Sequence, residues 1–242
     1  MFDWNEQRIA FLQSAAARTT FYEDLARRIA HLLSDAQTVC DAGCGPGFLS
    51  FAMSRHFPRI FAADRDETAV RFLQNELTLR AIRNVTAARC DLSAYTPEQP
   101  FDAMVFCLFG PMDACLAIGR RCCRGKLLVI KRNDRHHRFS LTAQPLVGES
   151  ADDAAALLDC RAIPYSRENF SSELGQPLKS LDDAMDFFRS YSRDDPAALT
   201  YDAVRARLRQ TDDPVFPYYL PQTRPLSLFV IDIKELCHEE TV

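Results

Sequence analysis

The sequence lacks an apolar run long enough to cross a membrane. Its longest apolar stretches, such as residues 103–110, fall far short of the roughly 20 residues that a membrane-spanning helix requires. The amino-terminal segment carries Asp3 and Glu6 before its first arginine and leads into no long apolar segment, so it does not have the pattern of a secretory signal. These absences predict a soluble, cytoplasmic protein without a membrane partner.

The sequence also lacks the cysteine spacing of a disulfide framework or a zinc site. It has nine cysteines, an odd number, with no CxxC pair and no histidine at zinc-finger spacing. Several lie within apolar runs, among them Cys40 and Cys107, where a thiol usually serves as a small buried apolar group. We therefore expect free thiols in a reducing compartment and no metal site.

A surplus of positive charge is absent as well. The 29 Lys and Arg residues face 33 Asp and Glu residues, for a net charge of −4, which gives no overall attraction for phosphate backbones or anionic lipid. A nucleic-acid partner is therefore disfavoured and would need a local basic patch, such as the run from Lys131 to Arg138. That run is more typical of an exposed loop than of an anion-binding or general-base site around His136 and His137.

What the sequence does have is a regular alternation of helical and strand patterns. At 242 residues, with 47% apolar and 26% charged residues, the chain has the length of one large domain carrying an insertion. Short apolar strands separated by helix-length segments indicate an α/β fold, a doubly wound, mostly parallel sheet of seven strands with helices on both faces. Helices are expected at 20–33, 47–56, 67–80, 181–191 and 198–208, and strands at 38–42, 59–63, 85–88, 103–108, 126–130, 160–165 and 226–233.

The most informative segment is the glycine-rich turn over residues 39–49, VCDAGCGPGFL. A strand ends at Asp41, the chain turns through alternating glycines, and a helix opens. Gly43 and Gly45 permit torsions and close approaches that a Cβ would block, so a ligand can lie directly on the main chain. A dinucleotide site has the fingerprint G-x-G-x-x-G, whereas the spacing here is G-x-G-x-G, and the Asp41 carboxylate would repel a pyrophosphate. The turn therefore favours a ligand with a positive charge.

This turn resembles the first motif of the class I S-adenosylmethionine-dependent methyltransferases, an apolar strand followed by D/E-x-G-x-G-x-G. The resemblance covers residues 20–132, and residues 226–233 are similar to the last strand of that fold. It implies that S-adenosylmethionine is the cofactor, with its methionine part over Gly43, Cys44 and Gly45 and its ammonium group near Asp41. The alternative to this cofactor-binding role is a turn that merely tolerates glycine and binds no ligand.

The resemblance also gives a role to the end of the second strand. Asp64, followed by Arg65, stands seventeen residues after Gly47, at the spacing of the family's ribose ligand. A carboxylate there can accept hydrogen bonds from both ribose hydroxyls. The alternative role for Asp64 is to cap the next helix, but Asp66 is better placed for that.

Two further pairs of residues follow from the resemblance. Asp91 matches the acid that accepts from the adenine amino group, with Leu92 beside the ring; the alternative is a solvated loop residue. Phe106 and Cys107, at the end of the fourth strand, would lie next to the cofactor. The N/D-P-P-Y/F motif of adenine and glutamine amino-group methyltransferases is replaced by LFGP at residues 108–111, so those two substrates are disfavoured.

No catalytic residue can be assigned from the sequence. Methyl transfer from a sulfonium is an in-line displacement, and the enzyme mainly holds the nucleophile about 3 to 3.5 Å from the methyl carbon, away from water. A general base is needed only when the attacking atom must lose a proton. The leading hypothesis is methyl transfer to a small molecule. Alternatives are an RNA or protein methyltransferase, a non-catalytic S-adenosylmethionine-binding protein, and an NAD-dependent oxidoreductase, which the missing third glycine weakens.

Two segments are candidates for specificity elements. Residues 1–36 form an apolar helical arm before a methyltransferase domain at 37–242, and residues 175–224 form a helical insertion that we expect to emerge at the cofactor edge as a lid over the acceptor. Six of the aromatic residues in the insertion are equally suited to an acceptor pocket and to a core of its own. These are Phe187, Phe188, Tyr191, Phe216, Tyr218 and Tyr219, of which Tyr191 or Tyr219 would reach the acceptor.

Overall fold

The centre of the molecule is a seven-stranded sheet in the order β3-β2-β1-β4-β5-β10-β6. The computed structural model describes residues 3–134, 136–145 and 147–240. Strands β1 to β5 run parallel, and β10 runs antiparallel to both of its neighbours. The strands are β1 (Thr38–Ala42), β2 (Arg59–Asp64), β3 (Val85–Arg89), β4 (Phe101–Cys107), β5 (Cys123–Arg132), β6 (Ser166–Glu173) and β10 (Thr223–Asp232). The predicted fold class is confirmed.

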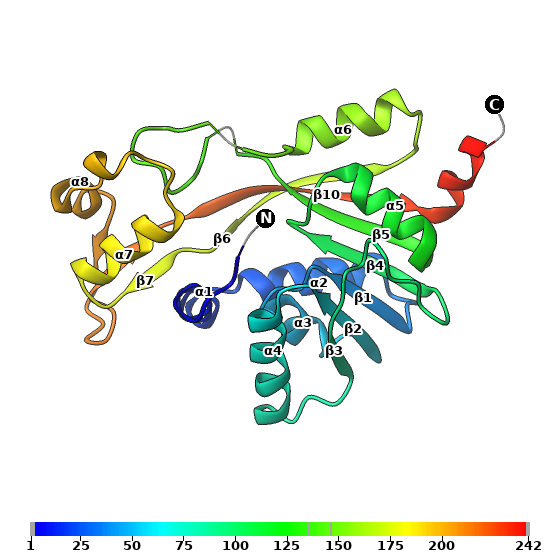
Figure 1. Cartoon of the computed structure of the whole chain (residues 1–242), viewed down its shortest axis with the longest axis horizontal. Helices are drawn as coiled ribbons and strands as arrows, with labels where there is room; N and C mark the ends of the chain where they lie inside the picture. Colours follow the sequence, from blue (N-terminus) through cyan, green and yellow to red (C-terminus); the bar gives the residue numbers. More distant parts are fainter. Residues whose placement is uncertain (1–2, 135, 146, 241–242) are drawn as a thin grey trace.

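Helices cover both faces of this sheet (Figure 1). One face carries α2 (Phe21–Leu32), α3 (Phe48–Met53) and α4 (Glu67–Leu79), and the other carries α5 (Met112–Cys122), α6 (Ala151–Cys160) and the 3-10 helix η2 (Ile233–Glu240). Helix α2 corresponds to the helix expected at 20–33, and its apolar face is buried, with Leu25 and Ile29 fully inaccessible. Each face therefore has its own apolar core, and the carboxyl ends of β1 to β5 all meet at one edge.

The sixth predicted strand, at residues 160–165, is wrong. Helix α6 continues to Cys160, and the chain turns at Ala162, which has a φ of 51°. The Ile163 amide donates to the Leu158 carbonyl at 3.0 Å, and the Ile163 side chain packs into the core beneath α6, so the apolar pattern reflects a helix end. The true strand, β6, lies at the edge of the sheet. Only one of its eight residues is buried, and the strand lacks the apolar alternation that marks a half-buried strand.

The insertion between β6 and β10 is only partly helical. Its first helix, α7 (Leu181–Tyr191), has the predicted bounds, but the second predicted helix, at 198–208, is reduced to the short α8 (Tyr201–Arg205) after the 3-10 turn η1 (Pro196–Ala198). A three-stranded sheet in the order β7-β9-β8 completes the insertion. Its strands, β7 (Gln176–Leu178), β8 (Arg209–Gln210) and β9 (Tyr218–Leu220), are two or three residues long, too short for periodicity to reveal.

The amino-terminal helix α1 (Glu6–Arg18) packs against this insertion. The Phe11 ring lies 5.2 Å from the Phe187 ring, edge to face, and the Gln176 side-chain amide donates to the Phe11 carbonyl at 3.1 Å. Phe11, Phe187 and Phe188 belong to one apolar cluster, separate from the two cores of the sheet. Phe187 and Phe188 are therefore core residues of the insertion.

The insertion begins at the carboxyl edge of the parallel strands. Glu173, the last residue of β6, pairs with Thr223, and Leu226 pairs with Arg132 at the end of β5. Both connections to the insertion thus lie at the edge where β1 reaches the glycine turn. In Figure 1 the insertion, with α7 and α8, projects beyond this end of the sheet, and α1 lies beside β7.

Candidate functional site

The main chain of the turn after β1 forms one wall of the candidate site. Gly43 and Gly45 have φ values of 71° and 53°, in the left-handed region that favours glycine. The amides of Gly43 and Cys44 donate to the Ala63 carbonyl at 2.8 and 3.1 Å, which fixes the turn to β2. A Cβ on Gly43 would lie 2.4 Å from the Phe109 ring, and one on Gly45 would lie 2.9 Å from the Trp4 ring. Both glycines therefore allow an aromatic ring to approach the main chain more closely than a Cβ would permit.

Asp41 places a buried carboxyl group beneath the turn. It is 1% exposed, and its Oδ2 accepts a hydrogen bond from the Ser50 hydroxyl at 2.5 Å. Burial raises the pKa of Asp41 to about 6, the Ser50 hydrogen bond opposes this, and the nearby charge of Asp64 adds to it. No basic side chain in the described part of the chain forms an ion pair with Asp41. A cationic ligand group would supply the missing charge, so the residues at the turn fit an ammonium.

Asp64 and Asp66 have different tasks. The Asp64 carboxylate accepts from the Gly45 amide at 2.8 Å and from the Asp66 amide at 2.9 Å, so it holds the turn in place. Asp66 is the N-cap of α4 and accepts from the Ala69 amide at 2.9 Å, as expected from the sequence. Each Asp64 oxygen retains a second acceptor position, which leaves the predicted ribose contact open. Arg65, between the two acids, is exposed.

The remaining predicted residues lie at the ends of the neighbouring strands. Asp91 is exposed and accepts from the amide and hydroxyl of Ser93 at 2.9 and 2.7 Å, bonds that lower its pKa. Leu92 is 4% exposed and packs in the core below. At the end of β4, Phe106 is fully buried and Cys107 half-buried. The structure brings all of these candidates to the edge where the glycine turn lies.

Sequence reasoning missed two aromatic residues at this edge. Leu108 has a φ of 56°, and its amide donates to the Ile130 carbonyl at 2.9 Å, so the chain bends sharply after β4 and places Phe109 on Gly43. A non-glycine residue in this region is uncommon and often marks a functional edge. The second aromatic residue is Trp4, which belongs to the apolar arm at residues 1–36. Its backbone amide donates to Asp66 at 3.1 Å, which anchors the arm beside the turn.

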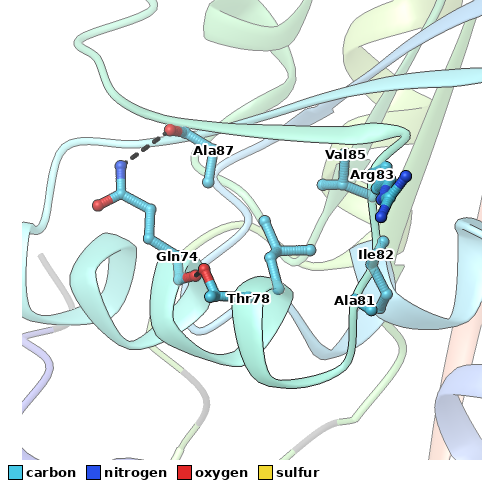
Figure 2. Close-up of a pocket in the computed structure, with 8 residues that line it drawn as sticks. Gln74, Thr78, Ala81, Ile82, Arg83, Val85 and Ala87 are labelled. Atoms are coloured by element: carbon cyan, nitrogen blue, oxygen red, sulfur yellow. Dashed lines mark hydrogen bonds between the residues drawn. The ribbon is translucent and has the colours of Figure 1, made fainter.

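A pocket on the surface between α4 and β3 lies away from these residues. It is lined by Gln74, Thr78, Ile82 and Val85, among others, and the Gln74 side chain donates to the Ala87 carbonyl at 3.0 Å (Figure 2). Val85 begins β3, so the pocket faces the amino-terminal edge of the sheet. None of the candidate site residues lines it, and we assign it no ligand.

Comparison with known proteins places the glycine turn within a known domain. Residues 39–124 match the family model described as "Methyltransferase domain". Trans-aconitate 2-methyltransferase from Azoarcus sp. (strain BH72) is 32% identical over 101 residues. That match spans 41% of this chain and 36% of the relative, so the chain matches about a third of the length of this curated protein.

Solved structures share the fold at low sequence identity. YcgJ protein from Bacillus subtilis is 11% identical with a TM-score of 0.54, covering 86% of this chain and 97% of that one. A SAM-dependent methyltransferase from Aquifex aeolicus is 14% identical with a TM-score of 0.50, covering 87% and 90%. The fold is that of the class I S-adenosylmethionine-dependent methyltransferases. The match over residues 39–124 lies within this fold and includes the glycine turn.

Neither a membrane-spanning helix nor a metal-binding group of side chains is found among the described residues. No helix among them is long and apolar enough to span a membrane. Within the same residues, no three His, Cys, Asp or Glu side chains gather in a group able to hold a metal ion.

Proposed function

We propose that this protein binds S-adenosylmethionine at the glycine turn and transfers its methyl group to a small-molecule acceptor. The observation that carries the proposal is the buried Asp41 carboxyl group, which lies beneath two glycines in left-handed conformations and has no basic partner among the described residues. The methionine part would lie over Gly43, Cys44 and Gly45, with its ammonium group on Asp41.

The other predicted residues complete the cofactor site. Asp64 would accept from the ribose hydroxyls and Asp91 from the adenine amino group, with Leu92 beside the ring. Arg65, Phe106 and Cys107 would line the remaining edge. When bound, the cofactor supplies an electrophilic methyl group on a sulfonium. The residues of the chain bind and orient it and exclude water, which is what an in-line displacement chiefly requires.

We also infer that the arm at 1–36 and the insertion at 175–224 close this site as one unit. Three contacts support the inference. The Trp4 ring lies on Gly45, α1 shares an apolar cluster with α7, and the Tyr191 hydroxyl donates to the Arg8 carbonyl at 3.3 Å. Because Trp4 lies on the surface that the cofactor needs, the arm has to shift when the cofactor enters. The Tyr219 hydroxyl donates instead to Glu173 at 2.7 Å, which favours Tyr191 as the tyrosine near the acceptor.

A small acceptor is favoured over RNA or protein for two reasons. The net charge of −4 gives no attraction for a nucleic-acid backbone, and the matched relative is named for trans-aconitate, a small organic acid.

The eight described cysteines are all unpaired, which is consistent with the reducing, cytoplasmic location predicted from the sequence.

Thermal unfolding with three adenosine-containing ligands tests the proposal. S-adenosylmethionine and S-adenosylhomocysteine should raise the melting temperature, because ligand at 100 times its Kd stabilises the folded state by roughly 2.7 kcal/mol. NAD should leave it unchanged. Mass spectrometry of any ligand retained on purification adds an independent readout. A shift with NAD alone, or none with either sulfur nucleoside in a folded sample, would contradict the proposal.

A further inference from the structure

Arginine side chains gather at the carboxyl edge of the sheet, beyond Cys107. Arg132 ends β5, Arg138 lies in the loop that follows, and Arg224 is the second residue of β10. These three arginines form the arginine cluster. Burial raises the pKa of the neighbouring Asp134, and the charges of all three arginines oppose that rise. The cluster therefore carries more positive than negative charge.

Two guanidinium nitrogens of the cluster are buried without an acceptor. Arg224 is 6% exposed, and its Nε has no hydrogen-bond partner among the described residues. The same holds for Nη1 of Arg138. Instead, the Arg224 guanidinium lies 5.2 Å from the centre of the Phe21 ring, and that of Arg138 lies 4.2 Å from the Phe139 ring. Burying a charged donor without an acceptor is costly, so an arrangement of this kind is suited to a ligand that brings acceptor oxygens.

The cluster is next to the predicted cofactor site. Arg224 lies against Phe21 at the start of α2, and the ring of the next residue, Tyr22, stacks on the Phe48 ring at the start of α3, 5.7 Å away. Tyr22 therefore lies between the arginine cluster and the helix that follows the glycine turn. A molecule bound by the arginines would lie beside the cofactor and not on a remote surface.

We propose that Arg224 and Arg138 bind a carboxylate group of the methyl acceptor, so that the acceptor is a small organic acid. This inference rests on the proposed function. Guanidinium groups present paired N–H donors that match the two oxygens of a carboxylate. A phosphate dianion fits less well, because Asp134 lies close to the cluster. Burial lowers the pKa of both arginines; the charge of Arg224 lowers that of Arg138 further, and the charge of Arg132 lowers that of Arg224. A bound anion relieves these effects.

The loop that carries Arg138 is built to hold this arrangement. Asp194 accepts from the Ser140 hydroxyl at 2.6 Å and from the Leu141 amide at 2.6 Å, and Arg207 donates to the Ser140 carbonyl at 2.9 Å. Both Asp194 and Arg207 come from the insertion. Within this segment Lys131 is 3% exposed and is paired with Glu149 at 2.7 Å, and Arg138 is half-buried. These two residues are therefore not part of the exposed basic loop that the composition favours, whereas His136 is exposed.

Calorimetry on the S-adenosylhomocysteine-saturated protein tests the inference. The probes are citrate and trans-aconitate, their neutral amides, and glycerol 3-phosphate. We expect the carboxylates to bind and the amides not to bind. In Arg224→Gln the carboxylate affinity should fall at least about tenfold. Arg224→Lys should have an intermediate affinity, because lysine keeps the positive charge but lacks the paired N–H donors of a guanidinium group. The matched control is Arg71→Gln, which removes an exposed arginine on α4 paired with Glu67 and should change nothing.

Two further readouts separate a binding role from a structural one. Arg224→Gln should keep its affinity for S-adenosylhomocysteine within about twofold, and its melting temperature without ligand should not fall, because an unpaired buried charge is removed. Carboxylate should raise the melting temperature of the wild type but not of the variant. Binding of the amides or of glycerol 3-phosphate in preference to the carboxylates, or no carboxylate binding to the saturated protein, would overturn the inference. Failure to bind S-adenosylhomocysteine at all would instead overturn the proposed function.

Discussion

At the scale of single residues, the proposed cofactor site depends most on Asp41. A carboxyl group with a pKa of about 6 is partly protonated in mildly acidic solution, whereas an ordinary aspartate, near 3.9, is not. Only the ionised form attracts an ammonium group. The cost of burying that charge in the free protein is offset when the cofactor brings the opposite charge.

Cofactor affinity should therefore depend on pH in a defined direction. Because the pKa of Asp41 is raised in the free protein, S-adenosylhomocysteine affinity should be constant above about pH 7 and fall by up to about tenfold per unit below pH 6. Titration calorimetry from pH 5 to pH 8 measures this. Asp41→Asn should bind more weakly at pH 8 and show no such fall. An equal fall in wild type and variant would assign the effect to another group.

Alanine substitutions of the neighbouring acids Asp64 and Asp66 provide a matched pair of variants. Asp64→Ala should weaken S-adenosylhomocysteine binding by about 2 to 4 kcal/mol, since it removes a charged acceptor of the ribose hydroxyls. Asp66→Ala removes the N-cap of α4 and should cost about 1 kcal/mol of stability with a smaller effect on binding. Calorimetry and thermal unfolding of both variants test the assignment. Unchanged affinity in Asp64→Ala would show that this carboxylate serves only to hold the turn.

At the scale of elements, the arm before α1 controls access to the glycine turn. Because the Trp4 ring lies against Gly45, it has to move before a ligand can occupy that surface. Trp4→Ala should therefore raise the association rate constant for S-adenosylhomocysteine, which stopped-flow fluorescence with a labelled analogue can measure. Phe11→Ala, which loosens α1 from α7, should act in the same direction. Rates equal to those of the wild type in both variants would argue against closure by the arm.

The elements also show where sequence patterns succeed and fail. Strands β1, β4 and β5 are buried on both faces, so their apolar runs identify them directly. Strand β6 is at the edge and largely polar, and the apolar residues just before it belong to a helix end. The β7-β9-β8 sheet consists of very short strands whose pairing depends on the rest of the insertion. Neither feature leaves a periodic signal in the chain.

For the whole molecule, the sequence predicts that the candidate cofactor residues share one edge because they follow consecutive strands of one motif. The turn from Asp41 to Gly45 and the acid Asp64 are separated by a constant βαβ unit, so their spacing in sequence reports their proximity in space. The arginine cluster could not be found this way. Arg138 and Arg224 are 86 positions apart and meet only because β10 returns antiparallel beside β5 after the insertion.

The most direct test of the central claim is a crystal structure of the complex with S-adenosylhomocysteine. We expect the amino-acid part of the ligand on Gly43 and Gly45, with its ammonium nitrogen within about 4 Å of the Asp41 carboxylate. The ribose hydroxyls should lie within hydrogen-bond distance of Asp64, and Trp4 should be displaced from its position on Gly45. Ligand density elsewhere in the molecule, or at the turn with Asp41 and Asp64 making no contact to it, would contradict the account.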